Sequence, residues 1–379
     1  MRWTLLAALL WAGAAQAGWP VIGEGGRETS RQVEPTDLFE DVEVFWGDHD
    51  AVSSTRDLAA MARATGQRLD RQERQGRPAP HGMLDQLGIS KEEVRATLQF
   101  VADVAREDRG ESYQRLSDPE WIAAHFRVLR WHADLEGAGN HRVRLTDGQI
   151  RLTRYLAYRF QGSYEPTAEF DTALYSLPED ESGLSSVAAG STVGLIRSLL
   201  TRKQVLDGAF EDGGRHEGAA EPLVYMSRQH VHEALLQGTV QVALPDGTRS
   251  TFSVHRNNGR SFRHGRTAEE QDRFWYFRET ESDDQGGVNN GIALRPFVAV
   301  AGDVNNLGYG GLYALEGDNG TLRLVVLADT GGAFQPNMYQ FDLFTGTHES
   351  REALNEATAH IPARPSAYML VLRDTIEVP

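Results

Sequence analysis

An acidic side chain within an aromatic strand pattern is the first candidate for chemistry in this sequence. Asp342 lies in residues 339–344 (YQFDLF). Because side chains alternate across a strand, Asp342 should point away from Phe341. Gln340 and Phe344 should share its face. Aspartate is disfavoured inside strands, and partly apolar surroundings would raise its pKa, which suits a general acid. An ordinary solvent-facing aspartate is the alternative.

Two further aspartates follow the ends of neighbouring strand patterns. Asp303 comes after residues 300–302 (VAG), and Asp329 comes after residues 324–328 (LVVLA) and shortly before two glycines. A carboxylate at such a position can accept hydrogen bonds from the backbone N–H groups of a turn. Taken alone, the residues therefore indicate structural roles for both.

The elements that must position these aspartates change in character along the chain. Residues 18–36 are expected to form a flexible lead-in, and residues 37–138 read as helical. Ser90 begins a capping box, and Asp118 precedes a helix that starts with proline. The inward residues of that second helix are expected to be Trp121, Ile122, Phe126 and Leu129.

After about residue 140 the pattern is one of short strands between turns. A hairpin is expected over residues 239–254. Five strands are expected near the C-terminus, at residues 297–301, 311–315, 322–328, 339–344 and 368–372. Short strands with glycine-rich turns favour a small barrel over a parallel sheet. The fold class is therefore α+β or mainly β.

Composition limits the possible functions. The length of 379 residues suggests two domains, and the net charge of −16 makes nucleic acid an unsuitable partner. Residues 1–17 have the pattern of a cleaved signal peptide, so a periplasmic or secreted, monomeric protein is expected. No cysteine is present, so neither a disulfide nor a lipid anchor at the cleavage site is expected. The histidines form no recognisable metal-binding motif, and no cofactor is expected.

The sequence resembles the MltA family of lytic transglycosylases, whose C-terminal 3D domain is named for three aspartates. The resemblance covers roughly residues 150–375. It is carried by residues 161–166 (QGSYEP), 202–209 (RKQVLDGA), 237–247, 257–262 (NNGRSF), 273–278 (RFWYFR), 300–303 (VAGD), 328–333 (ADTGGA) and 341–344 (FDLF). The linker over residues 331–338 is about two residues longer than in the family and lacks its Lys-Gly pair.

The resemblance implies a fold, a domain division and a set of site residues. Helices and a double-psi β-barrel would occupy residues 37–166 and 266–379, with an inserted β-rich domain at residues 167–265. Asp342 would be the catalytic acid, with Asp303 and Asp329 in support. A groove for a polysaccharide should offer aromatic faces and amide or hydroxyl groups, and the residues expected to bind the substrate there are Tyr164, Glu165, Gln237, Gly238, Asn258, Gly259, Phe277 and Gln340. For the aromatic residues and the Asn-Gly pair, core or turn roles are the alternatives.

The implied reaction is cleavage of peptidoglycan between N-acetylmuramic acid and N-acetylglucosamine without water, which gives a 1,6-anhydro product. One carboxyl group suffices, because the nucleophile is the sugar's own 6-hydroxyl. Two alternatives stay open at this point. One is a glycoside hydrolase that uses Asp342 and Asp329 as a carboxylate pair. The other is a non-catalytic glycan-binding barrel.

Overall fold

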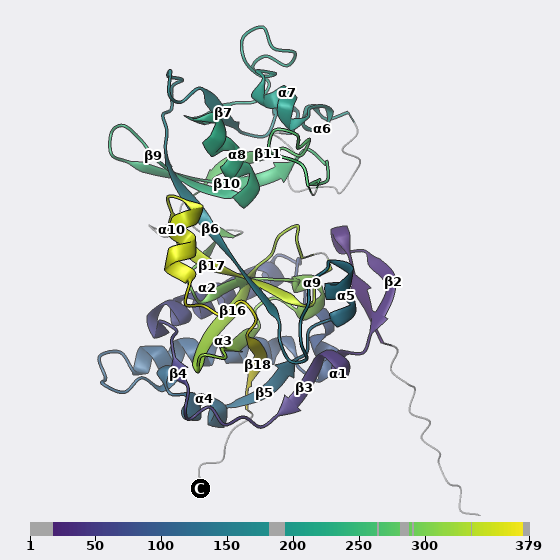
Figure 1. Cartoon of the computed structure of the whole chain (residues 1–379), viewed down its shortest axis with the longest axis vertical. Helices are drawn as coiled ribbons and strands as arrows, with labels where there is room; N and C mark the ends of the chain where they lie inside the picture. Colours follow the sequence, from purple (N-terminus) through teal and green to yellow (C-terminus); the bar gives the residue numbers. More distant parts are fainter. Residues whose placement is uncertain are drawn as a thin grey trace, which may run out of the picture.

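The computed structural model shows two lobes connected by a continuous β-sheet (Figure 1). It describes residues 18–181, 194–263, 265–280, 288–289, 292–334 and 336–373. The expected signal peptide, residues 1–17, lies outside the described residues. None of the described helices has the length and apolar character needed to cross a membrane.

A mixed sheet of twelve strands runs through both lobes. Its order is β11 (Trp275–Thr280), β10 (Arg249–Asn257), β9 (Thr239–Ala243), β6 (Arg151–Gln161), β17 (Gln340–His348), β14 (Ala299–Ala301), β16 (Thr321–Asp329), β15 (Leu312–Glu316), β18 (Ser366–Leu372), β5 (Phe126–Trp131) and β3 (Phe39–Val42), with β4 (Asp50–Ala51) beside β16. The five C-terminal strands and the 239–254 hairpin are confirmed. The sheet also contains parallel pairs, such as β6 with β17 and β14 with β16, which the sequence pattern did not predict.

The described residues form two apolar clusters. The lower lobe is built around one of them, to which the C-terminal strands contribute. Phe341 of β17 is fully buried there, with its ring 4.7 Å from that of Trp131 and 4.9 Å from that of Tyr313. The helices of this lobe are α1 (Pro35–Leu38), α2 (Thr55–Arg74), α3 (Lys91–Glu107), α4 (Pro119–His125), α5 (Leu135–Asn140) and α9 (Val304–Leu307). The predicted capping box at Ser90 begins α3.

The N-terminal region differs from the sequence prediction in several places: strands β3, β4 and β5 all lie within residues 37–138, which were expected to be helical. Helix α4 ends at His125, and Phe126 begins strand β5, so Phe126 and Leu129 do not lie on a helix. Both are buried within the sheet, because β5 pairs with β3 and β18. The expected flexible lead-in instead contains a strand pair, β1 (Trp19–Ile22) with β2 (Glu28–Val33). Asn306 fixes this pair, since its side chain accepts from the Trp19 indole at 3.0 Å.

The upper lobe has its own apolar cluster, centred on β9, β10 and β11. It adds β7 (Thr172–Tyr175), β8 (Pro222–Met226), α6 (Ile196–Leu199), α7 (Arg202–Leu206) and α8 (Arg228–Gln237), with α10 (Arg351–Thr358) at the junction (Figure 1). Strands β12 (Val288–Asn289) and β13 (Ile292–Ala293) form a short separate pair. The cluster also contains Leu156 and Phe277, and both residues lie outside the range 167–265. The division at 167–265 remains a prediction.

Strand β6 is common to both lobes. Its first part pairs in parallel with β17, from Arg151 opposite Gln340 to Tyr155 opposite Phe344. Its last part, from Tyr158 to Gln161, pairs in parallel with β9 of the upper lobe. One continuous strand therefore holds the β17 aspartate in a fixed relation to the upper lobe.

Candidate active site

Asp342 on β17 is in register with one residue on each of three nearby strands, β6, β14 and β16. Thr153 of β6 is its partner on one side and Ala301 of β14 on the other. Ala301 in turn pairs with Asp329 of β16. Residues in register point to the same face of a sheet, and two strand spacings separate the backbones of the two aspartates by about 10 Å. The sheet therefore presents both carboxyl groups on one face.

The carboxyl group of Asp342 is desolvated and incompletely hydrogen-bonded. Its Oδ1 atom is buried and accepts no hydrogen bond from any described residue. Burial raises the pKa of Asp342 to about 6; the Thr153 hydroxyl lowers it, the charge of Asp329 raises it, and Arg351 and Arg151 lower it. The residue as a whole is only half-buried. A carboxyl group of this kind can carry a proton at mildly acidic pH and still reach a ligand.

Asp329 is held by two donors at the end of β16. The Tyr155 hydroxyl donates to Oδ2 at 2.6 Å, and the Thr330 N–H donates to Oδ1 at 2.7 Å. Burial raises the pKa of this carboxyl group as well. The Tyr155 ring packs on Phe344, with centroids 5.3 Å apart. Tyr155 thereby links Asp329 to the face on which Asp342 lies.

Asp303 has a structural environment. It is fully buried and caps α9, where Oδ1 accepts from the Asn306 N–H at 3.3 Å. Its Oδ2 accepts from the Asn306 side-chain amide at 2.7 Å and from the Asn337 N–H at 2.8 Å. Burial raises its pKa to about 6 in spite of these donors. The capping role expected from the sequence is confirmed, and Asp303 ties the 331–338 linker to α9.

A cleft of about 270 Å³ separates the two lobes; of the three aspartates, Asp329 lines it, whereas Asp342 and Asp303 do not. The lower lobe contributes Tyr155, Leu294, Asp329, Thr330 and Phe344. The facing residues are Gln237, Gly238, Thr239, Ser253, Val254, Arg278 and Thr280, with Leu156 and Ala157 of β6 connecting the two walls. Since Phe344 lines the cleft and shares the face of Asp342, that face opens into the cleft.

Three of the expected substrate-binding residues lie at or next to this cleft. Gln237 and Gly238 line it, at the end of α8. Gln340 is buried and donates from Nε2 to the Thr153 hydroxyl at 3.0 Å, so it supports the partner of Asp342. Tyr164 and Glu165 are exposed and do not line the cleft; the Tyr164 hydroxyl is 2.8 Å from that of Ser250.

The other three expected binding residues have structural environments. Phe277 is fully buried in the upper apolar cluster, so its ring has no surface for a glycan. Asn258 is also buried, and its side-chain amide donates to the carbonyl oxygens of Leu200 and Asp272 at 2.9 and 2.8 Å. Gly259 has a positive φ of 75° and forms the turn that follows. For these residues, the core and turn alternatives are the ones that the structure favours.

Sequence reasoning missed Thr153, Tyr155 and Arg278. Thr153 and Tyr155 lie two residues apart on β6 and therefore share a face. The sequence gives no sign that this strand pairs with β17, nearly two hundred residues later. Arg278 carried no such signal either, because the strand residues before it, Tyr276 and Phe277, are buried on both faces of β11.

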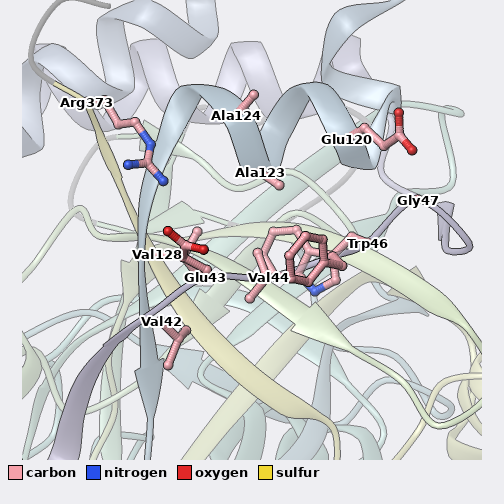
Figure 2. Close-up of a pocket in the computed structure, with 11 residues that line it drawn as sticks. Val42, Glu43, Val44, Trp46, Gly47, Glu120, Ala123, Ala124, Val128 and Arg373 are labelled. Carbon is pink, nitrogen blue, oxygen red and sulfur yellow. The ribbon is translucent and has the colours of Figure 1, made fainter.

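A second cavity, of about 340 Å³, lies at the far end of the lower lobe, against α4 (Figure 2). Its walls include Ala123, Val128 and Trp46. Glu43 and Glu120 at its edge are exposed, and none of the three aspartates lines it. Without a desolvated carboxyl group, this cavity is a poor candidate for acid catalysis. Among the described residues no group of histidine, aspartate and glutamate side chains is arranged to hold a metal ion.

Comparisons with known proteins identify the fold. No family model and no curated protein matches the sequence. The crystal structure of a membrane-bound lytic murein transglycosylase from Agrobacterium tumefaciens is 17% identical, with a TM-score of 0.60, over 88% of this chain and 97% of that one. E. coli MltA with bound chitohexaose is 17% identical, with a TM-score of 0.54, over 89% and 95%. MltA from Neisseria gonorrhoeae is 15% identical, with a TM-score of 0.54, over 95% and 97%. The chain therefore has the fold of the MltA-type lytic murein transglycosylases, as its sequence motifs predicted.

Proposed function

We propose that this protein is a lytic transglycosylase that cleaves peptidoglycan glycan strands in the cleft between its lobes. The observation that carries the proposal is the carboxyl group of Asp342, which lies on a sheet face that opens into the cleft. Its Oδ1 atom has no hydrogen-bond partner among the described residues, and its pKa is raised to about 6. The likeness of fold to murein transglycosylases supports the choice of substrate.

In the proposed reaction, protonated Asp342 donates its proton to the glycosidic oxygen between N-acetylmuramic acid and N-acetylglucosamine. The C1–O bond breaks, and positive charge develops at C1 of the muramyl ring. The 6-hydroxyl of the same ring attacks C1, and the Asp342 carboxylate takes its proton. The product is a 1,6-anhydro muramyl end, and Asp342 is protonated again for the next turnover. Because the nucleophile belongs to the substrate, no second carboxylate is needed to activate water.

The surroundings of Asp342 suit both halves of this cycle. Burial and the nearby negative charge of Asp329 favour the protonated form before the reaction, because both penalise the carboxylate. Both carboxylate oxygens of Asp329 already accept hydrogen bonds, one from the Tyr155 hydroxyl and one from the Thr330 N–H. These two hydrogen bonds favour a supporting electrostatic role for Asp329 over activation of a water molecule.

The same proposal extends to fold detail and location. We assign a double-psi arrangement to the barrel-forming strands around Asp342, and the inserted domain to the upper lobe. A substrate in the cell wall places the protein in the periplasm or outside the cell, in keeping with the signal-peptide pattern of residues 1–17.

Digestion of purified murein sacculi tests the function. The wild-type protein should release soluble fragments with 1,6-anhydro ends, which mass spectrometry detects as one water lighter than hydrolysis products. Fragments with reducing ends would establish the two-carboxylate hydrolase instead. A protein that binds sacculi but releases nothing would be the non-catalytic barrel. Asp342→Asn should bind sacculi and release nothing.

A further inference from the structure

The upper wall of the cleft carries an arginine that has no ionic partner among the described residues. Arg278 lies on β11, and its side chain is exposed where it lines the cleft. No described residue forms a salt bridge or hydrogen bond with its guanidinium group. Ser253, its partner in register on β10, and Thr280 line the cleft beside it, with their hydroxyl oxygens 3.2 Å apart.

Two other arginines of the upper lobe are paired with a carboxylate. Arg197 and Arg256 both pair with the buried Glu181, at 2.6 and 2.9 Å. A cation left unpaired at a concave surface attracts anions more strongly than one on an open surface, because the low-dielectric walls concentrate its field. The whole chain has a net charge of −16, which repels an anionic polymer. Binding such a polymer therefore depends on local positive charge in the cleft.

We propose that Arg278 binds a carboxylate on the branch at O3 of the muramyl ring and so selects murein over neutral polymers of N-acetylglucosamine. This inference rests on the proposed function. The planar guanidinium group matches a carboxylate with two parallel hydrogen bonds, and the Ser253 and Thr280 hydroxyls can add a further donor.

The chemistry of the sugar agrees with the positions of the two walls. The atoms that react, C1 and the 6-hydroxyl, lie at one edge of the muramyl ring, and O3 lies at the opposite edge. When the reacting edge faces Asp342 on the lower lobe, the O3 branch projects toward the upper wall, where Arg278 lies. The branch carries the lactyl carboxylate in strands without peptide, and the carboxylates of the stem peptide in complete murein. Both sources present the same chemistry to Arg278.

The test compares wild type, Arg278→Gln and the control Arg215→Gln. Arg215 is an exposed arginine of the upper lobe that does not line the cleft. Three soluble substrates are digested at low ionic strength: strands with stem peptides, strands stripped of peptide by an amidase, and stripped strands whose lactyl carboxylates are converted to methylamides. The measurement is kcat/KM for release of anhydro ends.

Arg278→Gln should lower kcat/KM about fivefold on a carboxylate-bearing strand and leave it unchanged on the methylamide strand. A loss on peptide-bearing strands alone assigns the contact to the stem peptide; a loss on stripped strands as well assigns it to the lactyl group. Equal losses on all three substrates, or a result that matches Arg215→Gln, would overturn the inference.

Binding gives a readout that does not need activity. In an Asp342→Asn background, carboxylate-bearing strands should bind about fivefold more tightly than methylamide strands, and Arg278→Gln should remove that difference. If wild type proved inactive on every substrate, the proposed reaction would fail. The binding preference would then decide the role of Arg278 by itself, and equal affinities for all strands would refute it.

Discussion

Asp303 and Asp342 are carboxyl groups of the same lobe, and burial raises the pKa of each to about 6. Their surroundings differ in what the oxygens contact. Both oxygens of Asp303 accept hydrogen bonds, from Asn306 and Asn337, whereas Oδ1 of Asp342 accepts none from the described residues. A raised pKa is thus shared by a structural and a proposed catalytic carboxyl group. Unused hydrogen-bonding capacity beside a cleft is what separates them.

The largest expected effect comes from Asp342→Asn. The amide cannot donate a proton as an acid, so release of anhydro fragments should fall by about 10²–10⁴-fold. The free energy of unfolding should stay the same or rise slightly, because no hydrogen bond to Oδ1 is lost and a desolvated carboxyl group is removed. Fragment release and urea unfolding measure the two quantities. Activity near the wild-type level would remove Asp342 from the mechanism.

Asp303→Asn should show the opposite pattern. An amide nitrogen in place of Oδ2 would face the Asn337 N–H and the Asn306 side-chain amide, which are both donors. Loss of two hydrogen bonds at a fully buried position should lower the free energy of unfolding by about 1–3 kcal/mol. Activity per folded molecule should change far less than in Asp342→Asn. A stable but inactive Asp303→Asn variant would contradict the structural assignment.

The pH dependence should follow from both raised pKa values. As pH rises above about 6, Asp342 loses its proton and kcat/KM should fall about tenfold per pH unit. Folded Asp303 and Asp342 hold protons that the unfolded chain releases near its ordinary pKa of 3.8. Their contribution to stability is therefore present below about pH 4 and is lost as pH rises through about 6. Urea unfolding across this range measures it, and Asp303→Asn should flatten the slope.

The smallest effect should come from Asp329→Asn. The charge of Asp329 is one cause of the raised pKa of Asp342. Its removal should move the alkaline limb of the kcat/KM profile to lower pH and cost about two- to fivefold in rate at neutral pH. Tyr155→Phe should move the limb in the same direction but less far, because the lost hydroxyl lowers the pKa of Asp329 and its removal favours the uncharged form of that carboxyl group. A limb that does not move in Asp329→Asn would show that burial alone sets the pKa of Asp342.

The sequence predicted local features of the site well. Strand alternation placed Phe341 in the core and Asp342 on the opposite face with Phe344, and the capping role of Asp303 followed from its position before a turn. These features depend on neighbours within a few residues. The apolar residues of segment 126–131 fit either a helix or a strand, and its pairing with β3 and β18 makes it a strand.

Contacts between distant segments could not be predicted in the same way. The hydrogen bond from Tyr155 to Asp329 joins residues 174 positions apart, and it depends on β6 lying in parallel beside β17. Asn258 and Phe277 are of residue types that glycans favour, but the same types fill turns and cores. Register between strands, which decides such cases, is a property of the whole sheet.

Strand β6 has a mechanical consequence. Because β6 is one strand that pairs with β17, across one register shift, and then with β9, the lobes are not connected there by a loop that could act as a free hinge. Widening the cleft requires the whole strand to twist or bend, and such a deformation is elastic and returns to its starting shape. On the proposed function, the protein should therefore accept a long polymer by small, reversible twisting of one sheet, with the proposed proton donor at a nearly constant depth.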